Sequence, residues 1–268
     1  MTGKDRLRSL FNKAKAENRA VFLPYLTAGL PSPKDSVAMF EAMAAAGADG
    51  FEVGFPYSDP LMDGPTIHAA GLRALQQGTT LDVAFDIVGD IVDKTGKPVI
   101  VMTYVNPVLA VGVQTFVDRL VDRGACALIV ADIAVGETAD IAAACAKRGI
   151  GYVQFVAPTT GSERLEKVVA DDPVFIYGIA ELGVTGERSE GSRNLNTLAE
   201  KVRAVSAIPL VFGVGISTPP QAAAAAAVGD GVIVGSALVR RVLEASTTTD
   251  AVSQLGADTA EFAKSMVR

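Results

Sequence analysis

The chain has 268 residues, of which 49% are hydrophobic and 20% are charged, and its formal net charge is −6. This composition is typical of a globular protein and excludes a disordered chain, while the length allows one large α/β domain or two small ones. An acidic chain is poorly suited to binding nucleic acid, although backbone amides and helix N-termini can still bind a small anion.

The cysteines and the apolar segments indicate the compartment. Cys126 and Cys145 each lie in an apolar, alanine-rich context, which predicts buried free thiols rather than a disulfide or a metal site. The first 15 residues are charged and have helical periodicity, without the apolar core of a signal peptide. No uncharged apolar run reaches the roughly 18 residues that a membrane span needs. We therefore expect a cytoplasmic protein.

Short apolar segments alternate with helical patterns along the whole chain. After a first amphipathic helix, the expected strands are 20–27, 51–55, 98–104, 125–130, 152–156, 174–177, 209–212 and 231–234. The expected helices between them are 34–46, 66–77, 81–94, 113–123, 137–148, 162–169, 195–205 and 221–228, with a last helix running to the end. Turn residues such as Gly and Pro separate most of these segments.

The alternation predicts the fold class. The strands are almost entirely apolar, which is typical of strands buried on both faces of a parallel sheet. Eight strand–helix units in about 250 residues predict a (β/α)₈ TIM barrel with an extra N-terminal helix. The alternative is a doubly wound open sheet, but the loop 28–32 lacks the glycine-rich fingerprint of that fold. We expect one domain, residues 1–268, because no linker divides the chain.

The stretch 51–67 combines a buried strand with a proline-rich loop and contains the carboxylates Glu52, Asp59 and Asp63. An ionised Glu is costly to bury in an apolar strand unless it has a partner or a function. We expect Glu52 to face the catalytic mouth with a raised pKa and Asp63 to stay ionised in a wetter loop, so that the two divide acid and base roles. The alternatives are a salt-bridged structural Glu52 and a turn or helix-capping Asp63; Asp59-Pro60 fits a turn.

Three other side chains are weaker candidates. Tyr177 ends the sixth strand and could bring a hydroxyl to the carboxylates, although a core tyrosine fits equally well. Asp132 follows the fourth strand, where it could face the mouth or cap the next helix. His68, the only histidine, lies in the first turn of a helix, where a surface role fits better than catalysis. Neither a Ser-His-Asp triad nor a metal site is visible.

Glycine-rich loops follow the sixth, seventh and eighth expected strands, at 183–186, 213–217 and 235–236. In TIM barrels the loops after strands seven and eight often bind phosphate through backbone N–H groups and a helix N-terminus. One such loop alone would be an ordinary turn, whereas three on successive strands favour a phosphate site. A dinucleotide is disfavoured because no ribose-binding acid lies at the expected offset.

These motifs resemble the tryptophan synthase alpha subunit family over almost the whole chain. The segment 52–67 is the most specific match, and 24–29 and the three glycine loops match other family motifs in the same order. The resemblance implies a TIM-barrel lyase that reversibly cleaves indole-3-glycerol phosphate to indole and glyceraldehyde 3-phosphate, in the last steps of tryptophan biosynthesis. It also implies that Glu52 is the general acid/base, that Asp63 binds the indole N–H, and that Tyr177 lines the site.

The resemblance further implies the binding residues and the partner. Phosphate contacts are implied at Gly186, Gly215, Gly235 and Ser236, and the indole pocket at Tyr25 and Met102. No metal or cofactor is implied in this subunit, because pyridoxal phosphate belongs to a beta subunit that receives indole through a tunnel in an alpha2beta2 heterotetramer. The loop 183–194 is implied to be a mobile lid. Contacts with the beta subunit are implied at Pro56, Asp59, Asn106 and Ala134.

The chain departs from the family pattern at three places. Leu30 stands where Asp is usual, Ala134 where Pro is usual, and Gly136-Glu137 where paired acids are common. The last two lie on the face expected to contact the partner, and none removes a catalytic residue. Three other functions remain open: a stand-alone lyase that releases indole, a binding subunit that activates a beta partner, and another phosphate-binding barrel such as a phosphoribosyl-anthranilate isomerase.

Overall fold

The computed structural model of the chain describes residues 1–179, 188–213 and 215–268. Its strands are β1 (Val21–Thr27), β2 (Phe51–Gly54), β3 (Val99–Thr103), β4 (Ala127–Val130), β5 (Gly151–Tyr152), β6 (Gln154–Val156), β7 (Ile176–Gly178), β8 (Leu210–Phe212) and β9 (Gly231–Val234). Its helices are α1 (Gly3–Ala16), α2 (Pro33–Ala45), α3 (Pro65–Gln76), α4 (Leu81–Thr95), α5 (Val105–Val111), α6 (Val113–Asp122), α7 (Ala139–Arg148), α8 (Ser162–Ala170), α9 (Arg188–Arg203), α10 (Pro219–Val228), α11 (Ser236–Glu244) and α12 (Thr248–Lys264).

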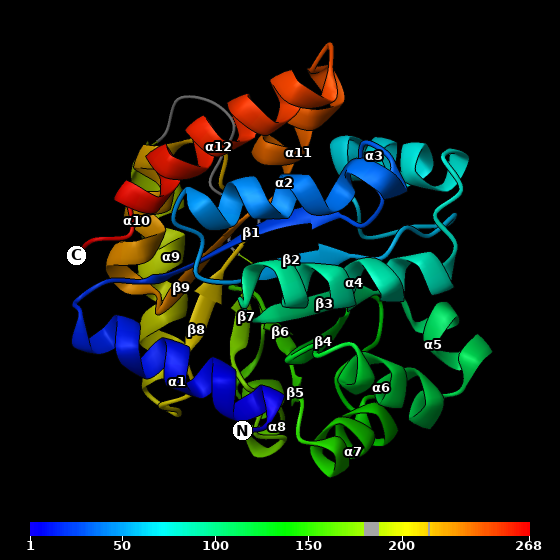
Figure 1. Cartoon of the computed structure of the whole chain (residues 1–268). Coiled ribbons are helices and arrows are strands. Elements are labelled where there is room, and N and C mark those ends of the chain that lie inside the picture. The colour runs from blue at the N-terminus through cyan, green and yellow to red at the C-terminus, as the bar shows by residue number, and fades with distance from the viewer. Residues whose placement is uncertain (180–187, 214) are drawn as a thin grey trace.

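The strands form a closed parallel barrel. They make one sheet in the order β5-β4-β3-β2-β1-β9-β8-β7-β6, and every strand pair in the described part of the chain is parallel. Only Val153 separates the two outermost strands, β5 and β6, which pair with β4 and β7 respectively. One chain segment therefore closes the sheet, and the barrel has eight strands with helices around it (Figure 1). The TIM-barrel prediction is confirmed, and the open-sheet alternative is wrong.

All eight expected strands are present, with boundaries that differ by at most about two residues. The single helix expected after β9 is wrong, because the chain forms two helices there, α11 and α12. A second departure is α5, which begins directly after β3, where Asn106-Pro107 had suggested only a break. Pro107 is the third residue of this helix, a position whose N–H has no intrahelical acceptor, so a proline is tolerated there.

The expected loop 183–194 is partly wrong. Helix α9 begins at Arg188, so residues 188–194 are helical. Arg and Glu have good helix propensity, and the single Gly191 costs only about 1 kcal/mol, so composition alone could not place this boundary. The rest of the expected lid, 183–187 with Gly186, lies outside the described residues.

An aromatic cluster directs the chain out of β2 toward the loop that contains Asp63. Phe55, directly after β2, packs edge-on against Phe85 of α4, with ring centroids 5.1 Å apart. Phe116 of α6 contacts Phe85 at the same separation, and all three rings are buried. Because the ring of Phe55 is held in this buried cluster, the position and direction in which the chain enters the proline-rich loop are fixed.

Helix α1 covers the N-terminal end of the barrel (Figure 1). Its buried residues are Leu7, Phe11 and Ala14, and the Phe11 ring lies 5.9 Å from that of Phe175, directly before β7. The Lys4 backbone N–H also donates to the carbonyl of Gly149, shortly before β5, at 3.0 Å. The extra N-terminal helix is therefore present, and it leaves the opposite end of the barrel open.

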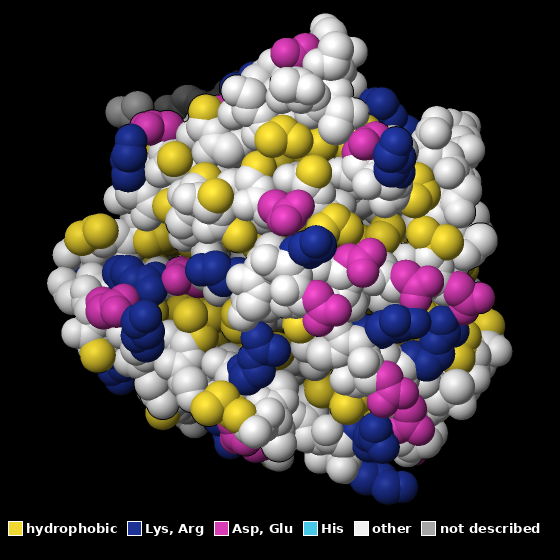
Figure 2. Space-filling view, in the orientation of Figure 1, with side chains coloured by type: hydrophobic (Ala, Val, Ile, Leu, Met, Phe, Trp, Pro, Cys, Tyr) yellow, Lys and Arg dark blue, Asp and Glu magenta, His cyan; other side chains and the backbone are white. Residues whose placement is uncertain are grey.

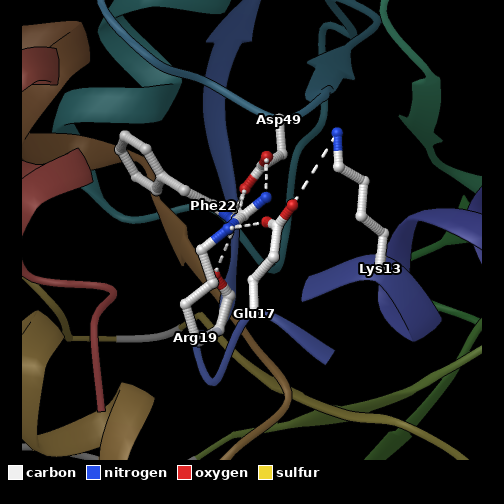
Figure 3. Close-up of polar contacts among 6 residues, drawn as sticks. Lys13, Glu17, Arg19, Phe22 and Asp49 are labelled. Atoms are coloured by element: carbon white, nitrogen blue, oxygen red, sulfur yellow. Dashed lines mark hydrogen bonds and ion pairs between the residues drawn. The ribbon is translucent and has the colours of Figure 1, made fainter. Parts of the chain in front are cut away.

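An ion-pair network joins the start of β1 to the turn before β2 (Figure 3). Arg19 donates to both carboxylate oxygens of Asp49, at 2.6 and 3.0 Å. The same carboxylate accepts the backbone N–H of Phe22 at 2.9 Å. Glu17 accepts from Arg19 at 2.8 Å and lies 3.9 Å from the ammonium of Lys13. Asp49 thus accepts hydrogen bonds from both a side chain and the backbone, near the start of the first two strands.

The surface carries charges of both signs. Over the face in Figure 2, basic and acidic side chains are interspersed with scattered apolar atoms, as is usual for a globular protein. Cys126 and Cys145 are buried free thiols, as expected. Within the described ranges, the helices are all too short or too polar to cross a membrane.

We predict that Asp49→Ala lowers the free energy of unfolding by about 2–3 kcal/mol, because the Arg19 guanidinium and the Phe22 N–H lose their acceptor in a partly buried position. Urea denaturation followed by circular dichroism measures this loss. Glu17→Ala is the matched control, since Glu17 contacts the same arginine but its side chain is 44% exposed against 14% for Asp49. Its cost should stay below about 1 kcal/mol. Equal losses in the two variants would contradict this account.

Candidate active site

A cavity of about 970 Å³ opens at the carboxyl ends of the barrel strands. Its walls come from the last residues of the strands and from the loops that follow them, such as Met102 in β3, Ala131 after β4 and Gly213 after β8. This is the end of the barrel opposite α1, and active sites of TIM barrels lie at this end. The expected site residues that line the cavity are Glu52, Asp63, Tyr177, Tyr25, Met102, Gly215, Gly235 and Ser236.

Most of the other expected site residues do not line the cavity or are not described by the structure. Gly186 lies outside the described residues. Pro56, Asp59 and Asn106, expected at a partner surface, do not line the cavity, whereas Ala134, expected at the same surface, does. Asp59 begins a tight turn, as the sequence suggested, because its backbone carbonyl accepts the N–H of Leu61 across Pro60 at 2.9 Å.

Glu52 is buried in β2 and points into the cavity. The residue is 4% exposed, and no described residue forms a hydrogen bond with its Oε2 atom. Burial, with the Asp63 charge as a smaller contribution, raises the pKa of Glu52 from 4.5 to about 8. Burial is thus the dominant cause, as expected, and no ion pair of Glu52 occurs among the described residues. A carboxyl with this pKa holds its proton at neutral pH and exchanges it readily.

Asp63 lies in the loop before α3 and is half-buried at the edge of the cavity. Burial raises its pKa, whereas the Tyr104 hydroxyl and the charge of His68 lower it. The wet setting expected from the sequence is therefore only partly right, because the side chain turns toward the cavity. The helix-cap alternative is wrong, since the residue that caps α3 is Gly64, without a side-chain bond.

Two buried tyrosines form the walls beside Glu52. Tyr25 is the register neighbour of Glu52 across β1 and β2, and Tyr177 lies in β7. Burial and the nearby Glu52 charge raise the pKa of both hydroxyls well above 10. A Cβ atom on Gly54 would overlap the Tyr25 hydroxyl, and one on Gly213 would overlap the Tyr177 hydroxyl. The two glycines therefore make room for the tyrosines.

The glycine loops form another part of the cavity lining. Gly215 has a φ of +80°, which favours glycine because other side chains are strained there. Gly235 caps α11 without a side-chain bond, and Ser236 is the first residue of that helix. The first N–H groups of a helix have no intrahelical acceptor and carry partial positive charge. This part of the cavity can therefore bind an anion.

Asp132 has a structural role that the sequence had only partly suggested. Its Oδ1 accepts the backbone N–H of Val105, the first residue of α5, at 2.7 Å. It therefore caps the helix after β3 rather than the helix after its own strand, while also lining the cavity. In the described part of the chain, no group of three or more His, Cys, Asp or Glu side chains is placed to hold a metal ion.

Two residues that line the cavity, and one neighbour of Asp63, had no predicted role in the site. Tyr104, whose buried hydroxyl lies near Asp63, precedes a helix that was not expected. Arg164 and Arg240 line the cavity from α8 and α11. Arg240 lies four residues after Ser236, so helical spacing could have placed both on one face. No sequence signal marked Arg164, because its position depends on how the loop before α8 folds.

Acid groups and glycine-rich loops at the carboxyl end of an eight-stranded parallel barrel define an enzyme of the phosphate-binding TIM-barrel class. The family model of the tryptophan synthase alpha chain matches residues 11–267. The alpha chain of Thermobifida fusca is 40% identical over 260 residues, covering 96% of each chain. That of Gloeobacter violaceus is 38% identical over 97% of this chain and 93% of the relative. The chain belongs to the tryptophan synthase alpha chain family.

Solved structures agree with this assignment. A chain of Mycobacterium tuberculosis tryptophan synthase is 38% identical and superposes with a TM-score of 0.88 over 98% of both chains. The tryptophan synthase alpha subunit of Legionella pneumophila is 30% identical, with a TM-score of 0.87 over 99% of this chain and 98% of that one. The chain is therefore a lyase subunit of tryptophan biosynthesis that cleaves indole-3-glycerol phosphate. The isomerase alternative is wrong.

We predict that Glu52→Gln stabilises the ligand-free protein at alkaline pH. The folded pKa of Glu52, about 8, lies above its value of 4.5 in the unfolded chain. The stability that this carboxyl contributes is therefore fully present below about pH 4.5 and is lost as the pH rises to about 8. A neutral glutamine avoids this loss, so the variant should gain on the order of a few kcal/mol relative to the parent between pH 5 and pH 9. Urea denaturation at several pH values measures the gain, and a constant offset at all pH values would contradict it.

Proposed function

We propose that Glu52 is the proton carrier of the cleavage, with Asp63 and Tyr177 as its neighbours in the reaction. The main support is the setting of Glu52: the carboxyl is buried, one of its oxygens has no partner, and its pKa is about 8. General acid/base catalysis works best when the pKa of the group lies near the working pH. An unpartnered oxygen in a cavity is also free to contact a substrate.

The two parts of the cavity suggest how the substrate lies. We place its phosphate at Gly215, Gly235 and Ser236, where backbone N–H groups can donate to the phosphate oxygens. We place the indole ring between Tyr25 and Met102, which line the same cavity nearer to Glu52. With the phosphate fixed, the carbon–carbon bond to be broken lies between the two parts, close to the carboxyls.

The chemistry follows from these positions. Glu52 gives its proton to indole C3, and the Asp63 carboxylate accepts the indole N–H and stabilises the positive charge that develops on the ring. Glu52, now ionised, takes the proton of the glycerol hydroxyl next to the bond that breaks. The bonding electron pair returns to the indole ring, and the hydroxyl carbon becomes the aldehyde of glyceraldehyde 3-phosphate. Glu52 ends in its starting protonation state, so no cofactor is needed for this half-reaction.

We also propose that the chain works with a beta subunit in an alpha2beta2 complex, and that pyridoxal phosphate belongs to that partner. Its relatives are alpha chains of a synthase. Leu61, Met62 and Leu109 are 87%, 60% and 60% exposed, and we assign them to one apolar patch, since contiguous exposed apolar patches mark contact surfaces. Asn106 donates to the Tyr57 hydroxyl at 2.9 Å, which joins the loop after β2 to α5 in one surface.

The remaining proposals concern the extent of that surface, the domain and the compartment. Pro56 and Asp59 lie in the same loop as Leu61, so we include them in the partner surface, with Ala134 on the side of the cavity.

We treat residues 1–268 as one domain, because one hydrophobic core includes residues from Leu7 to Met266. We place the protein in the cytoplasm, since buried free cysteines suit a reducing compartment.

We predict that Glu52→Gln lowers kcat for indole release from indole-3-glycerol phosphate by about 10³-fold or more, because the proton carrier is lost. Asp63→Asn should lower kcat by about 10²-fold, since the charge on the ring is then less well stabilised. Asp59→Asn is the matched control in the same loop, outside the cavity, and should change the activity of the isolated chain less than about twofold. Indole absorbance or fluorescence measures the rate.

The same assay with an added beta subunit separates the remaining functions. A slow rate that rises strongly with the partner supports the subunit assignment. A fast rate that the partner does not change would favour a stand-alone lyase. A Glu52→Gln variant as active as the parent would refute the proposed role of Glu52, and absence of cleavage in both conditions would leave a binding subunit.

A further inference from the structure

Two arginines line the cavity without a partner among the described residues. Arg164 of α8 and Arg240 of α11 both belong to its wall, and neither makes an ion pair or a hydrogen bond with the described residues. Arg241, the next residue of α11, pairs with Asp258 of α12 at 2.5 Å instead. The adjacent arginines of α11 thus face different surroundings: one is neutralised between two helices, and the other faces the cavity with its charge unpaired.

The position of Arg240 relates it to the anion-binding end of the cavity. It lies four residues after Ser236, so both side chains are on one face of α11, about one turn apart. Side chains of a helix point back toward its N-terminus, which brings the guanidinium toward Gly235 and Ser236. These three residues line the same cavity.

Arg164 occupies a position that its helix does not favour. It is the third residue of α8, and α8 begins after Gly161 without a side-chain cap. The N-terminus of a helix carries partial positive charge, so a cation in the first turn is disfavoured. Helices α8 and α11 lie on opposite sides of the barrel (Figure 1), so the two unpaired charges approach the cavity from different directions.

The negative charge of the chain and of its cavity explains why binding a phosphorylated substrate needs cationic side chains. The chain has a net charge of −6, and Glu52, Asp63 and Asp132 line the same cavity. A phosphate monoester carries a charge of about −1.5 to −2 at neutral pH. Helix N-termini and backbone amides supply only partial charges at short range, whereas a full positive charge at the rim attracts the anion before it docks.

We propose that Arg240 is a specificity-determining residue of the cleavage, which attracts the substrate phosphate and holds it at the α11 end of the cavity. Arg240 thereby sets the polarity of binding, with phosphate toward α11 and indole toward Glu52. This inference rests on the proposed function for its substrate. The arginine touches the phosphate and takes no part in proton transfer, so it acts on capture and binding rather than on the bond that breaks.

The experiment compares Arg240→Gln with Arg241→Gln. Both variants remove one positive charge from adjacent positions of the same helix, so a general effect of net charge is the same in each. Arg240→Gln should raise KM for indole-3-glycerol phosphate about 5- to 20-fold with kcat within about twofold, and should flatten the salt dependence of kcat/KM. Arg241→Gln should leave all three close to the parent, and Arg240→Lys should recover much of the affinity. Equal effects of the two glutamine variants would overturn the proposal.

A binding measurement separates this inference from the proposed function. Glycerol 3-phosphate carries the phosphate without the indole, and calorimetry measures its dissociation constant without turnover. Binding that weakens about 5- to 20-fold in Arg240→Gln and stays unchanged in Arg241→Gln supports the role of Arg240, even if the parent chain cleaves no substrate. Unchanged binding in Arg240→Gln overturns that role. Absence of binding to the parent chain would overturn both the phosphate site and the role of Arg240.

Discussion

The burial of one carboxyl group, that of Glu52, is the constraint on which the rest of the site depends. Its pKa of about 8 results mainly from removal from water, with a smaller contribution from the Asp63 charge. The closed barrel of apolar strands supplies the dry surroundings, and Tyr25 and Tyr177 complete the wall. Gly54 and Gly213 make room for the two tyrosine rings. A larger side chain at either glycine would displace a tyrosine and alter the packing around the carboxyl.

This constraint also explains where the positive charges lie. A cation beside Glu52 would favour its ionised form and lower its pKa, which would remove the proton needed at neutral pH. The cavity arginines, which have no partner among the described residues, lie instead on α8 and α11, and the glycine loops supply backbone N–H groups at the α11 end. One cavity can therefore hold a protonated acid and bind an anion, because no cation is among the causes that set the pKa of Glu52.

Much of the fold could be predicted from the sequence, because all eight strands are short apolar runs bounded by turn residues. Glu52 was also predictable, since a carboxylate inside such a run is anomalous. Helix α5 was not, because Asn106-Pro107 after a strand fits both a break and a first helical turn. Arg164 and Arg240 were missed because a helix residue lines the cavity only once the barrel is closed. Tyr104 was missed because its hydroxyl meets Asp63 only once the loop after β2 is in place. The same is true of the role of Gly54, which depends on the neighbouring strand.

The most direct test of the account is the pKa of the Glu52 carboxyl in the ligand-free protein. Infrared difference spectra between the parent chain and Glu52→Gln isolate the carboxyl C=O band, and its loss with rising pH gives the pKa of this one group. We expect a protonated carboxyl at pH 7 and a midpoint at about 8. A midpoint near 4.5, with the band absent at neutral pH, would contradict the claim that the barrel keeps this acid protonated for the reaction.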